Sequence, residues 1–324
     1  MSEISSKNAP KKCNRLNIKE ANDADLHAGN LSNWSQEYNQ TSCGSFHGEI
    51  AELGFEGLQV FRESTNRALQ QKCLVWPNSL WMGIPLANQP TSRINGVRVE
   101  SQQIMCRPGN ESFELSTPDD YSLYGMVIDQ RTLFDFAATH KIALNWTEIA
   151  SQGRLAIPAP TMNNIRFVLN RLLCRELSPL QCDKLSRDLL MMCILELIAQ
   201  EKPEPIKQPS HKRKKHTVDT ARSYIAGNVG EAITITDLCR HTSVSQRTLH
   251  YSFESILGIS PIHYLRITRL NEVRRRLSHC DESQNIFDIA SQWGFWHMSQ
   301  FAKDYKNLFA EYPSETKAKY VKHH

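Results

Sequence analysis

The sequence predicts an α+β protein: a small antiparallel β barrel with two helices in the amino-terminal half, and an all-α carboxy-terminal domain of two helix-turn-helix units. Three observations lead to this prediction. Short segments rich in β-branched and aromatic residues fill the region 40–130, apolar residues recur at helical spacing from residue 161, and one apolar pattern occurs twice after residue 235.

The length of 324 residues exceeds that of a typical single domain of about 100 to 200 residues, so it favours two domains. No apolar run approaches the roughly 18 residues that a membrane span needs, and we expect a cytoplasmic protein with no membrane partner. The nine cysteines are scattered without any CxxC pair, which indicates buried thiols and predicts no metal site and no cofactor.

The composition along the chain sets the expected domain boundaries. Residues 1–30 carry lysines but no following apolar stretch and are predicted to be a disordered leader. An effector-binding or dimerisation domain is expected over 31–200, a linker over the proline-rich segment 201–216, and a DNA-binding domain over 217–320. From Lys207 onward there are 18 Lys and Arg against 11 Asp and Glu, a basic excess that is typical of a module facing phosphate.

The amino-terminal elements follow from local patterns. The strand-like segments include residues 57–61, 72–76, 80–84 and 121–128, and a helix is expected over about 131–141. Two antiparallel helices are predicted within 161–200, separated near Ser178 and Pro179. The run from Met191 to Ile198 is apolar nearly all round, which fits either the core of its own domain or a contact with a second copy.

The carboxy-terminal repeat aligns residues 235–257 with residues 286–309 at an offset of 51 or 52 residues. In each copy a short helix precedes a turn, and a second helix opens at Ser245 or His297 with apolar residues on one face. The opposite face is then free to enter a major groove of DNA. The candidate base-reading residues on these faces are Gln246, Arg247, His250, Tyr251, Trp296, His297, Met298, Ser299 and Lys303.

An amphipathic helix from Pro261 to Leu277 is predicted to join the two units rigidly. Basic side chains on this helix and after it are candidates for contacts with backbone phosphates, which position a protein without reading sequence. These candidates are Arg266, Arg274, Arg275 and Lys306.

This region resembles the DNA-binding domain of AraC/XylS-family regulators. The residues that carry the resemblance are Gly258-Ile259-Ser260-Pro261, Arg269-Leu270-Asn271, Trp293-Gly294-Phe295, Ser299-Gln300-Phe301 and Pro313. Ala310 departs from the family pattern, which usually has glycine there, and Trp293 stands where tyrosine or a small apolar residue is common. The resemblance implies double-stranded DNA and RNA polymerase as partners, a small-molecule effector, a possible homodimer, and activation rather than repression.

The segment GSFHGEIAELGFEGLQVFREST, residues 44–65, more loosely resembles regulators of the ethanolamine-utilisation type. An aromatic lining with a few polar residues is typical of small-molecule pockets. The candidate effector residues are His47, Phe61, Arg62, Trp76, Trp81 and Tyr124. The same residues could instead fill a closed core.

Two other classes of protein remain as alternatives. A cupin-like metal enzyme fused to a DNA-binding domain would use His27 or His47, but the sequence contains no HxH, HExxH or GxSxG grouping, so no catalytic residue is assigned. An architectural DNA-binding protein would need only the basic tail, whereas the repeat presents different side chains on its two faces. A sequence-specific regulator is therefore the preferred interpretation, and an enzyme is not expected.

Overall fold

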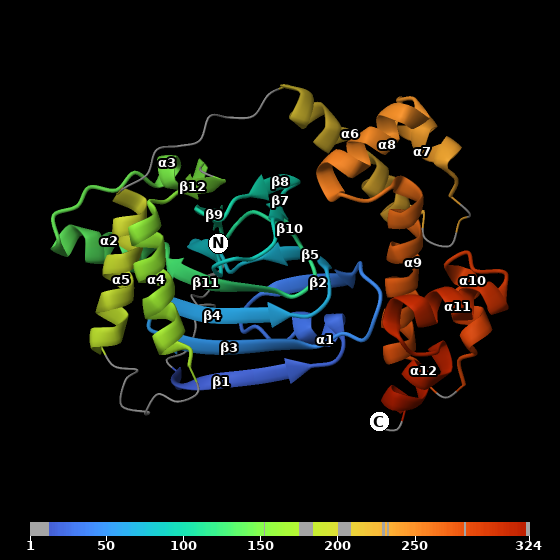
Figure 1. The fold of residues 1–324 in the computed structure, drawn as a ribbon, viewed down its shortest axis with the longest axis horizontal. Coiled ribbons are helices and arrows are strands. Elements are labelled where there is room, and N and C mark those ends of the chain that lie inside the picture. Colours follow the sequence, from blue (N-terminus) through green and yellow to red (C-terminus); the bar gives the residue numbers. More distant parts are fainter. Residues whose placement is uncertain are drawn as a thin grey trace, which may run out of the picture. The chain divides into compact units, whose positions relative to one another are not determined.

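The structure, a computed structural model, describes residues 13–151, 153–174, 184–199, 209–228, 231, 233–281 and 283–321. The chain forms two compact units (Figure 1). The amino-terminal unit comprises residues 1–38, 47–94 and 98–205, and the carboxy-terminal unit comprises 39–46, 95–97 and 206–324. Two short segments from the first half of the sequence thus belong to the carboxy-terminal unit.

The strands form two antiparallel sheets, and neither is closed into a barrel, so the predicted β-rich region is confirmed but the barrel is not. The strands of the seven-stranded sheet, in their order across it, are β1 (Cys13–Ala21), β3 (Gly48–Phe55), β4 (Leu58–Thr65), β11 (Tyr121–Asp129), β6 (Ser79–Pro85), β9 (Gln103–Pro108) and β12 (Arg154–Ala156). Those of the five-stranded sheet are β2 (Ser35–Gln40), β5 (Leu69–Leu74), β10 (Phe113–Thr117), β7 (Ser92–Ile94) and β8 (Val97–Val99).

One strand and one helix contradict the predicted disordered leader. Strand β1 and helix α1 (Ala24–Ala28) lie within residues 1–30, so the disordered leader is wrong for residues 13–30, and residues 1–12 lie outside the described part of the chain. Strand β1 pairs with β3, and Asp23 caps α1 through its side chain. The main-chain hydrogen bonds between β1 and β3 stabilise this segment, although its composition does not indicate a strand.

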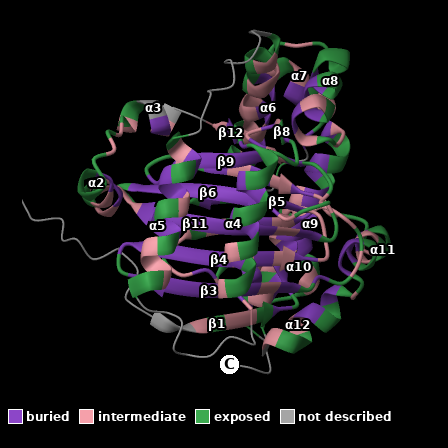
Figure 2. Ribbon diagram, turned by 60° about the vertical axis from the view of Figure 1, so that its left-hand side comes forward, coloured by how far each residue is buried: buried purple, intermediate pink, exposed green. Residues whose placement is uncertain are grey.

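The helices α4 (Ala159–Leu172) and α5 (Lys184–Ala199) cover one face of the seven-stranded sheet (Figure 2), as the helical spacing predicts. Alternate strand residues such as Leu58, Val60 and Met126 pack there against Ile165 and Ile194. The expected turn at Ser178 and Pro179 lies outside the described residues. Helix α2 (Gln130–Thr139) matches the predicted helix, and a short helix α3 (Trp146–Ser151) follows it.

The opposite face of the seven-stranded sheet carries buried polar groups. Gln59 and Glu63 of β4 point to this side, where the Tyr38 hydroxyl donates to Glu63 Oε1 at 2.9 Å and the Trp34 Nε1 group donates to Gln59 Oε1 at 3.0 Å. His27 Nε2 lies 3.1 Å from Glu63 Oε1, and His27 is fully buried. The amino-terminal unit therefore has an apolar core on one side of the sheet, and on the other a polar network beside the buried rings of Phe61 and Trp81.

The carboxy-terminal unit is helical, with α6 (Pro209–Gly227), α7 (Ile235–Thr242), α8 (Gln246–Leu257), α9 (Pro261–Ser278), α10 (Ile286–Gln292), α11 (Met298–Phe309) and α12 (Pro313–Val321). Helix α6 begins inside the predicted linker, so the linker is wrong for residues 209–216, because a proline at the first helical position is compatible with a helix. Residues 201–208 of that linker lie outside the described part. Among the described residues, no helix is long and apolar enough to cross a bilayer.

Candidate nucleic-acid interface

The first helix-turn-helix unit consists of α7 and α8, and side chains close both of its helix starts. Thr234 and Asp237 form a reciprocal capping box at α7, and Ser245 Oγ accepts from the Thr248 amide at α8, 3.2 Å away. The turn between them passes through Ser243 at φ 54°. Leu238, Leu249 and Phe253 are buried against α6, so the predicted inward face of α8 is confirmed.

The second unit consists of α10 and α11, with a longer turn through Gly294 at φ 79°. This glycine adopts a left-handed conformation that other residues rarely take. Phe301 and Tyr305 are buried, as the alignment of the two copies predicts. Helix α11 starts directly after His297, at the expected position.

Helix α9 contributes residues to the cores of both helix-turn-helix units. Tyr264 and Leu265 lie in the core of the first unit, whereas Leu270, Val273 and Leu277 lie in that of the second. Ser260 caps its start, and Pro261 occupies the first turn. One continuous helix of 18 residues therefore fixes the two recognition helices relative to each other.

The face of α8 predicted to read DNA is open. Gln246, Arg247, His250 and Tyr251 are all exposed, and Tyr251 is 59% exposed. His250 Nδ1 lies 3.5 Å from Glu254 Oε1, one helical turn further along. Arg247 has the planar guanidinium that suits a guanine edge.

The corresponding face around α11 is open too. Trp296, His297, Ser299 and Lys303 are exposed, and Trp296 is 62% exposed. Met298 is half-buried because it packs on the core of the second unit. The two faces carry different side chains.

The residues predicted to contact phosphates divide into two groups. Lys306 is exposed, with its ammonium 4.1 Å from the ring centre of Tyr312, and Arg266 is exposed but forms an ion pair with Asp304. Arg274 and Arg275 are largely buried and form ion pairs with Glu311 and Glu272 respectively. Their charges are thus neutralised inside the unit, which leaves Lys306 and Arg266 as the better candidates.

A basic cluster ahead of the first unit lies close to its recognition helix. The Lys214 ammonium is 4.2 Å from the ring centre of Tyr251 and 3.4 Å from Ser255 Oγ. The sequence shows the basic run at residues 212–215 but not that helix α6 carries it to α8. Helical continuation from Pro209 places Lys214 beside the reading face, so it adds to the candidate interface.

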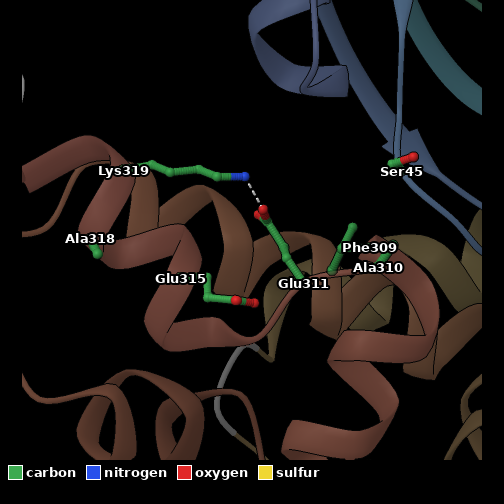
Figure 3. A pocket seen from close by; sticks show the side chains of 7 residues that line it. All are labelled: Ser45, Phe309, Ala310, Glu311, Glu315, Ala318 and Lys319. Atoms are coloured by element: carbon green, nitrogen blue, oxygen red, sulfur yellow. Dashed lines mark hydrogen bonds and ion pairs between the residues drawn. The ribbon is translucent and has the colours of Figure 1, made fainter.

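The carboxy-terminal ends of α8 and α11 share a left-handed residue, Gly258 at φ 78° and Ala310 at φ 58°. The backbone geometry of the repeat is thus kept although alanine replaces glycine. Beyond α11, a pocket is lined by Ser45, Phe309, Ala310, Glu311, Glu315, Ala318 and Lys319 (Figure 3). Lys319 forms an ion pair with Glu311 across it.

Glu311 is the central charged group of this helix end. Burial raises its pKa, but hydrogen bonds from Lys319 and Thr316 and the charge of Arg274 outweigh burial and hold the pKa below its usual value. The Thr316 hydroxyl also accepts a hydrogen bond from the buried Tyr305, at 2.9 Å. Glu311 therefore ties α9, α11 and α12 together.

The six predicted effector residues do not line one common site. Phe61 and Trp81 lie on the polar-network side of the seven-stranded sheet, where Trp34 contacts both rings edge-on. Arg62 and Tyr124 pair across β4 and β11 and point to the helix-covered side. His47 is exposed just before β3, and Trp76 is buried in the connection from β5 to β6.

Sequence reasoning did not identify the polar network itself. Its members come from α1, β2, β4 and β5, which are adjacent only after the sheets have formed. Two of its buried side-chain oxygens, Oε1 of Gln36 and Oε1 of Gln71, have no hydrogen-bond partner among the described residues. No three described His, Cys, Asp or Glu side chains gather where they could hold a metal ion.

Residues 238–319 match a family model described as a helix-turn-helix domain. The probable thc operon regulatory protein of Rhodococcus erythropolis is 34% identical over 99 residues, which cover 30% of this chain and 30% of that protein. The XylDLEGF operon transcriptional activator 2 of Pseudomonas putida is 34% identical over 94 residues, covering 29% of this chain and 60% of that protein. The match thus spans less than two thirds of each relative.

Among solved structures, an AraC-type DNA-binding domain regulator from Chromobacterium violaceum is 30% identical. The match covers 32% of this chain and 92% of that chain, with a TM-score of 0.30. The two capped helix pairs, the single helix that joins them and the matches to the family model and to the two relatives agree on one assignment. Through the helix-turn-helix domain of its carboxy-terminal unit, the chain belongs to the AraC/XylS family.

Proposed function

We propose that the protein is a sequence-specific DNA-binding regulator of transcription. The observation that carries the proposal is the pair of exposed, chemically different faces of α8 and α11, joined by one rigid helix. A recognition helix reads base edges in the major groove with three or four such side chains. The two faces together would read two successive groove segments about 34 Å apart.

Chemical roles can be assigned on the first face. The Arg247 guanidinium can donate two hydrogen bonds to the O6 and N7 atoms of a guanine, and the Gln246 amide can pair with an adenine. The half-buried Lys214 and the exposed Lys303 and Lys306 would add attraction to phosphates, which depends on salt but not on base sequence. Specificity would then come from α8 and α11, and part of the affinity from the lysines.

The direct test is selection of bound DNA from a random pool with the full-length protein. We expect a recovered motif with two conserved blocks one helical turn apart. Substitutions on α8 should change one block, and substitutions on α11 should change the other. Recovery of sequences without a common motif would refute sequence-specific reading and favour the architectural alternative.

We further propose that the amino-terminal unit binds a small-molecule effector and that the protein activates transcription through RNA polymerase. The buried polar network around Glu63 and Tyr38 supports an effector site, because it places hydrogen-bonding groups inside a β-rich unit. The Pseudomonas relative is named a transcriptional activator. In vitro transcription from a selected promoter, with and without candidate metabolites, tests both statements.

A homodimer would form through α5 in this proposal, but not through the face expected from the sequence. Met191, Ile194 and Leu195 are buried in the core of their own unit. The exposed apolar side chains of α5 are Leu185, Leu189 and Met192, which are 75%, 47% and 44% exposed. They lie one turn apart along one face of the helix, as in a helix that pairs with a copy of itself.

A further inference from the structure

The segment 39–46, which we call the strap, is bonded to α9 although more than 200 residues separate them in the sequence. The Gln40 amide donates to Asn271 Oδ1 at 3.0 Å, and the Asn271 Nδ2 group donates back to the Gln40 carbonyl at 3.0 Å. Gln40 is 2% exposed and Asn271 is 5% exposed. The Asn271 side chain thus forms with the main chain of Gln40 the two hydrogen bonds that a neighbouring strand would form.

The strap also completes the end of the second recognition helix. The last four carbonyl groups of a helix have no partner within it. The carbonyl of Leu308, in the last turn of α11, accepts from Gln40 Nε2 at 2.8 Å and from the Gly44 amide at 3.0 Å. One short segment therefore holds both α9 and the end of α11.

The conformation of the strap depends on Gly44. Its φ of 125° lies in a region that other residues avoid, so a side chain at this position is strained. The side chain of Gln40 further stabilises the bend, because its Nε2 group is 2.8 Å from the Ser42 carbonyl and 2.7 Å from the Gly44 carbonyl. Beyond the bend, Ser45 faces the pocket at the end of α11 (Figure 3).

The strap leaves the candidate reading face open. Ser299, Lys303 and Lys306 remain exposed, while the groups that the strap engages are on α9 and at the last turn of α11. Asn39 Oδ1 also accepts from Arg275 Nη2 at 2.8 Å, which holds that arginine within the unit. The contacts of the strap therefore hold the second helix-turn-helix unit in place without covering the side chains that would contact DNA.

From these contacts we infer that the strap is a positioning element for DNA reading: it holds α11 at a fixed angle to α9, and Gln40 and Asn271 are its key residues. The inference rests on the proposed function as a DNA-reading protein.

The test uses full-length protein with Gln40→Ala, Asn271→Ala or Gly44→Ala, and Gln284→Ala as control, since Gln284 is an exposed glutamine of the same unit. Affinity is measured for a selected site and for the same site with the block read by α11 scrambled. We expect each strap variant to bind the intact site about tenfold more weakly, which corresponds to about 1.4 kcal/mol. On the scrambled site the variants and the unsubstituted protein should bind equally.

This pattern separates positioning from a general loss of folding, because an unfolded domain would bind both sites more weakly. Hydrogen exchange gives a second readout: the Gln40 and Gly44 amides should exchange slowly in the unsubstituted protein and faster in Asn271→Ala. Equal affinity of the strap variants and the control for the intact site would overturn the inference, and so would tighter binding, which would make the strap an inhibitory contact. If no protein bound any selected site, the proposed function itself would fail.

Discussion

Arg274 Nη1 lies 2.8 Å from Glu311 Oε1, and each of these side chains is only 12% exposed. The Arg274 guanidinium also packs over the ring of Phe309, 4.6 Å from its centre. The pair joins α9 to the segment that follows the second recognition helix. The contacts of Arg274 thus lie within the carboxy-terminal unit, whereas the sequence predicts a contact with phosphate.

Replacing Arg274 should therefore destabilise the protein. Removal of one partner from a largely buried ion pair leaves the other charge without compensation and costs about 3 kcal/mol. We expect Arg274→Ala to lower the free energy of unfolding of the carboxy-terminal unit by about this amount, as measured by urea denaturation. Arg276→Ala is the control, because Arg276 is exposed on the same helix, and it should have little effect. Equal losses for the two variants would contradict the structural role.

The stability of the fold should also depend on pH through the ionisation of Glu311. Its pKa is held below the usual value in the folded state, so its ionised form stabilises the fold above the unfolded pKa of about 4.3. That contribution is lost as the pH falls through the lower folded pKa. Melting temperatures measured between pH 7 and acid should drop more steeply for the unsubstituted protein than for Glu311→Gln. Parallel curves would show that Glu311 does not contribute.

Arg247 and Lys306 should differ in how they affect DNA binding. Arg247→Ala removes a two-bond contact with a base, so we expect a loss of about 1 to 3 kcal/mol on the selected site and relaxed preference at one position. Lys306→Ala should weaken all sequences alike and reduce the slope of log affinity against log salt by about 0.9. Salt titrations on specific and random duplexes measure both. A uniform loss for Arg247→Ala would remove it from the reading face.

Ala310 is a position where glycine should stabilise the protein. A residue with a Cβ at φ 58° is strained by roughly 1 kcal/mol relative to glycine. Ala310→Gly should therefore raise the free energy of unfolding by about that amount, and Gly258→Ala should lower it similarly at the equivalent position. Thermal denaturation of both variants checks the pair. A loss of stability in Ala310→Gly would mean that the Cβ of Ala310 makes a contact that outweighs the strain.

The apolar stripe of α5 predicts the oligomeric state. A carboxylate at Leu189 would be buried without a partner in a dimer formed through this stripe, so Leu189→Glu should convert a dimer to a monomer. Leu26→Glu is the matched control, since Leu26 is a leucine of the same unit with 53% exposure outside the stripe. Sedimentation equilibrium of the three proteins decides the question. An unsubstituted protein that is monomeric at all concentrations would exclude this interface.

The helix-turn-helix units could be predicted because their signal is local. Leu249 and Phe253 recur at helical spacing, their counterparts Phe301 and Tyr305 repeat the pattern, and Ser245 precedes the helix that it caps. Position along the chain was enough to place most of the exposed side chains, but not Met298, which packs on the core. The partners of Arg274 and Arg275 could not be predicted, because ion pairs between elements depend on tertiary packing.

The six candidate effector residues could have been divided between the two faces of the sheet from the sequence alone. Phe61 and Arg62 are neighbours in one strand, and neighbouring strand residues face opposite sides of a sheet, so they cannot line one pocket. This alternation of side chains between the two faces of a strand could have been applied to the sequence. The bond between Gln40 and Asn271 is different, since no local pattern connects residues 231 positions apart.

The continuity of α9 has a consequence for the spacing of any DNA site. Each residue of a helix adds about 1.5 Å of length and about 100° of rotation. Insertion of a single residue between Leu265 and Leu270, where α9 passes from one core to the other, would turn one recognition helix away from the face that the other presents. The number of residues in this helix therefore sets the angle between the two recognition helices. Related proteins that present both helices to one side of the DNA must keep this number even where the exposed residues of the helix vary.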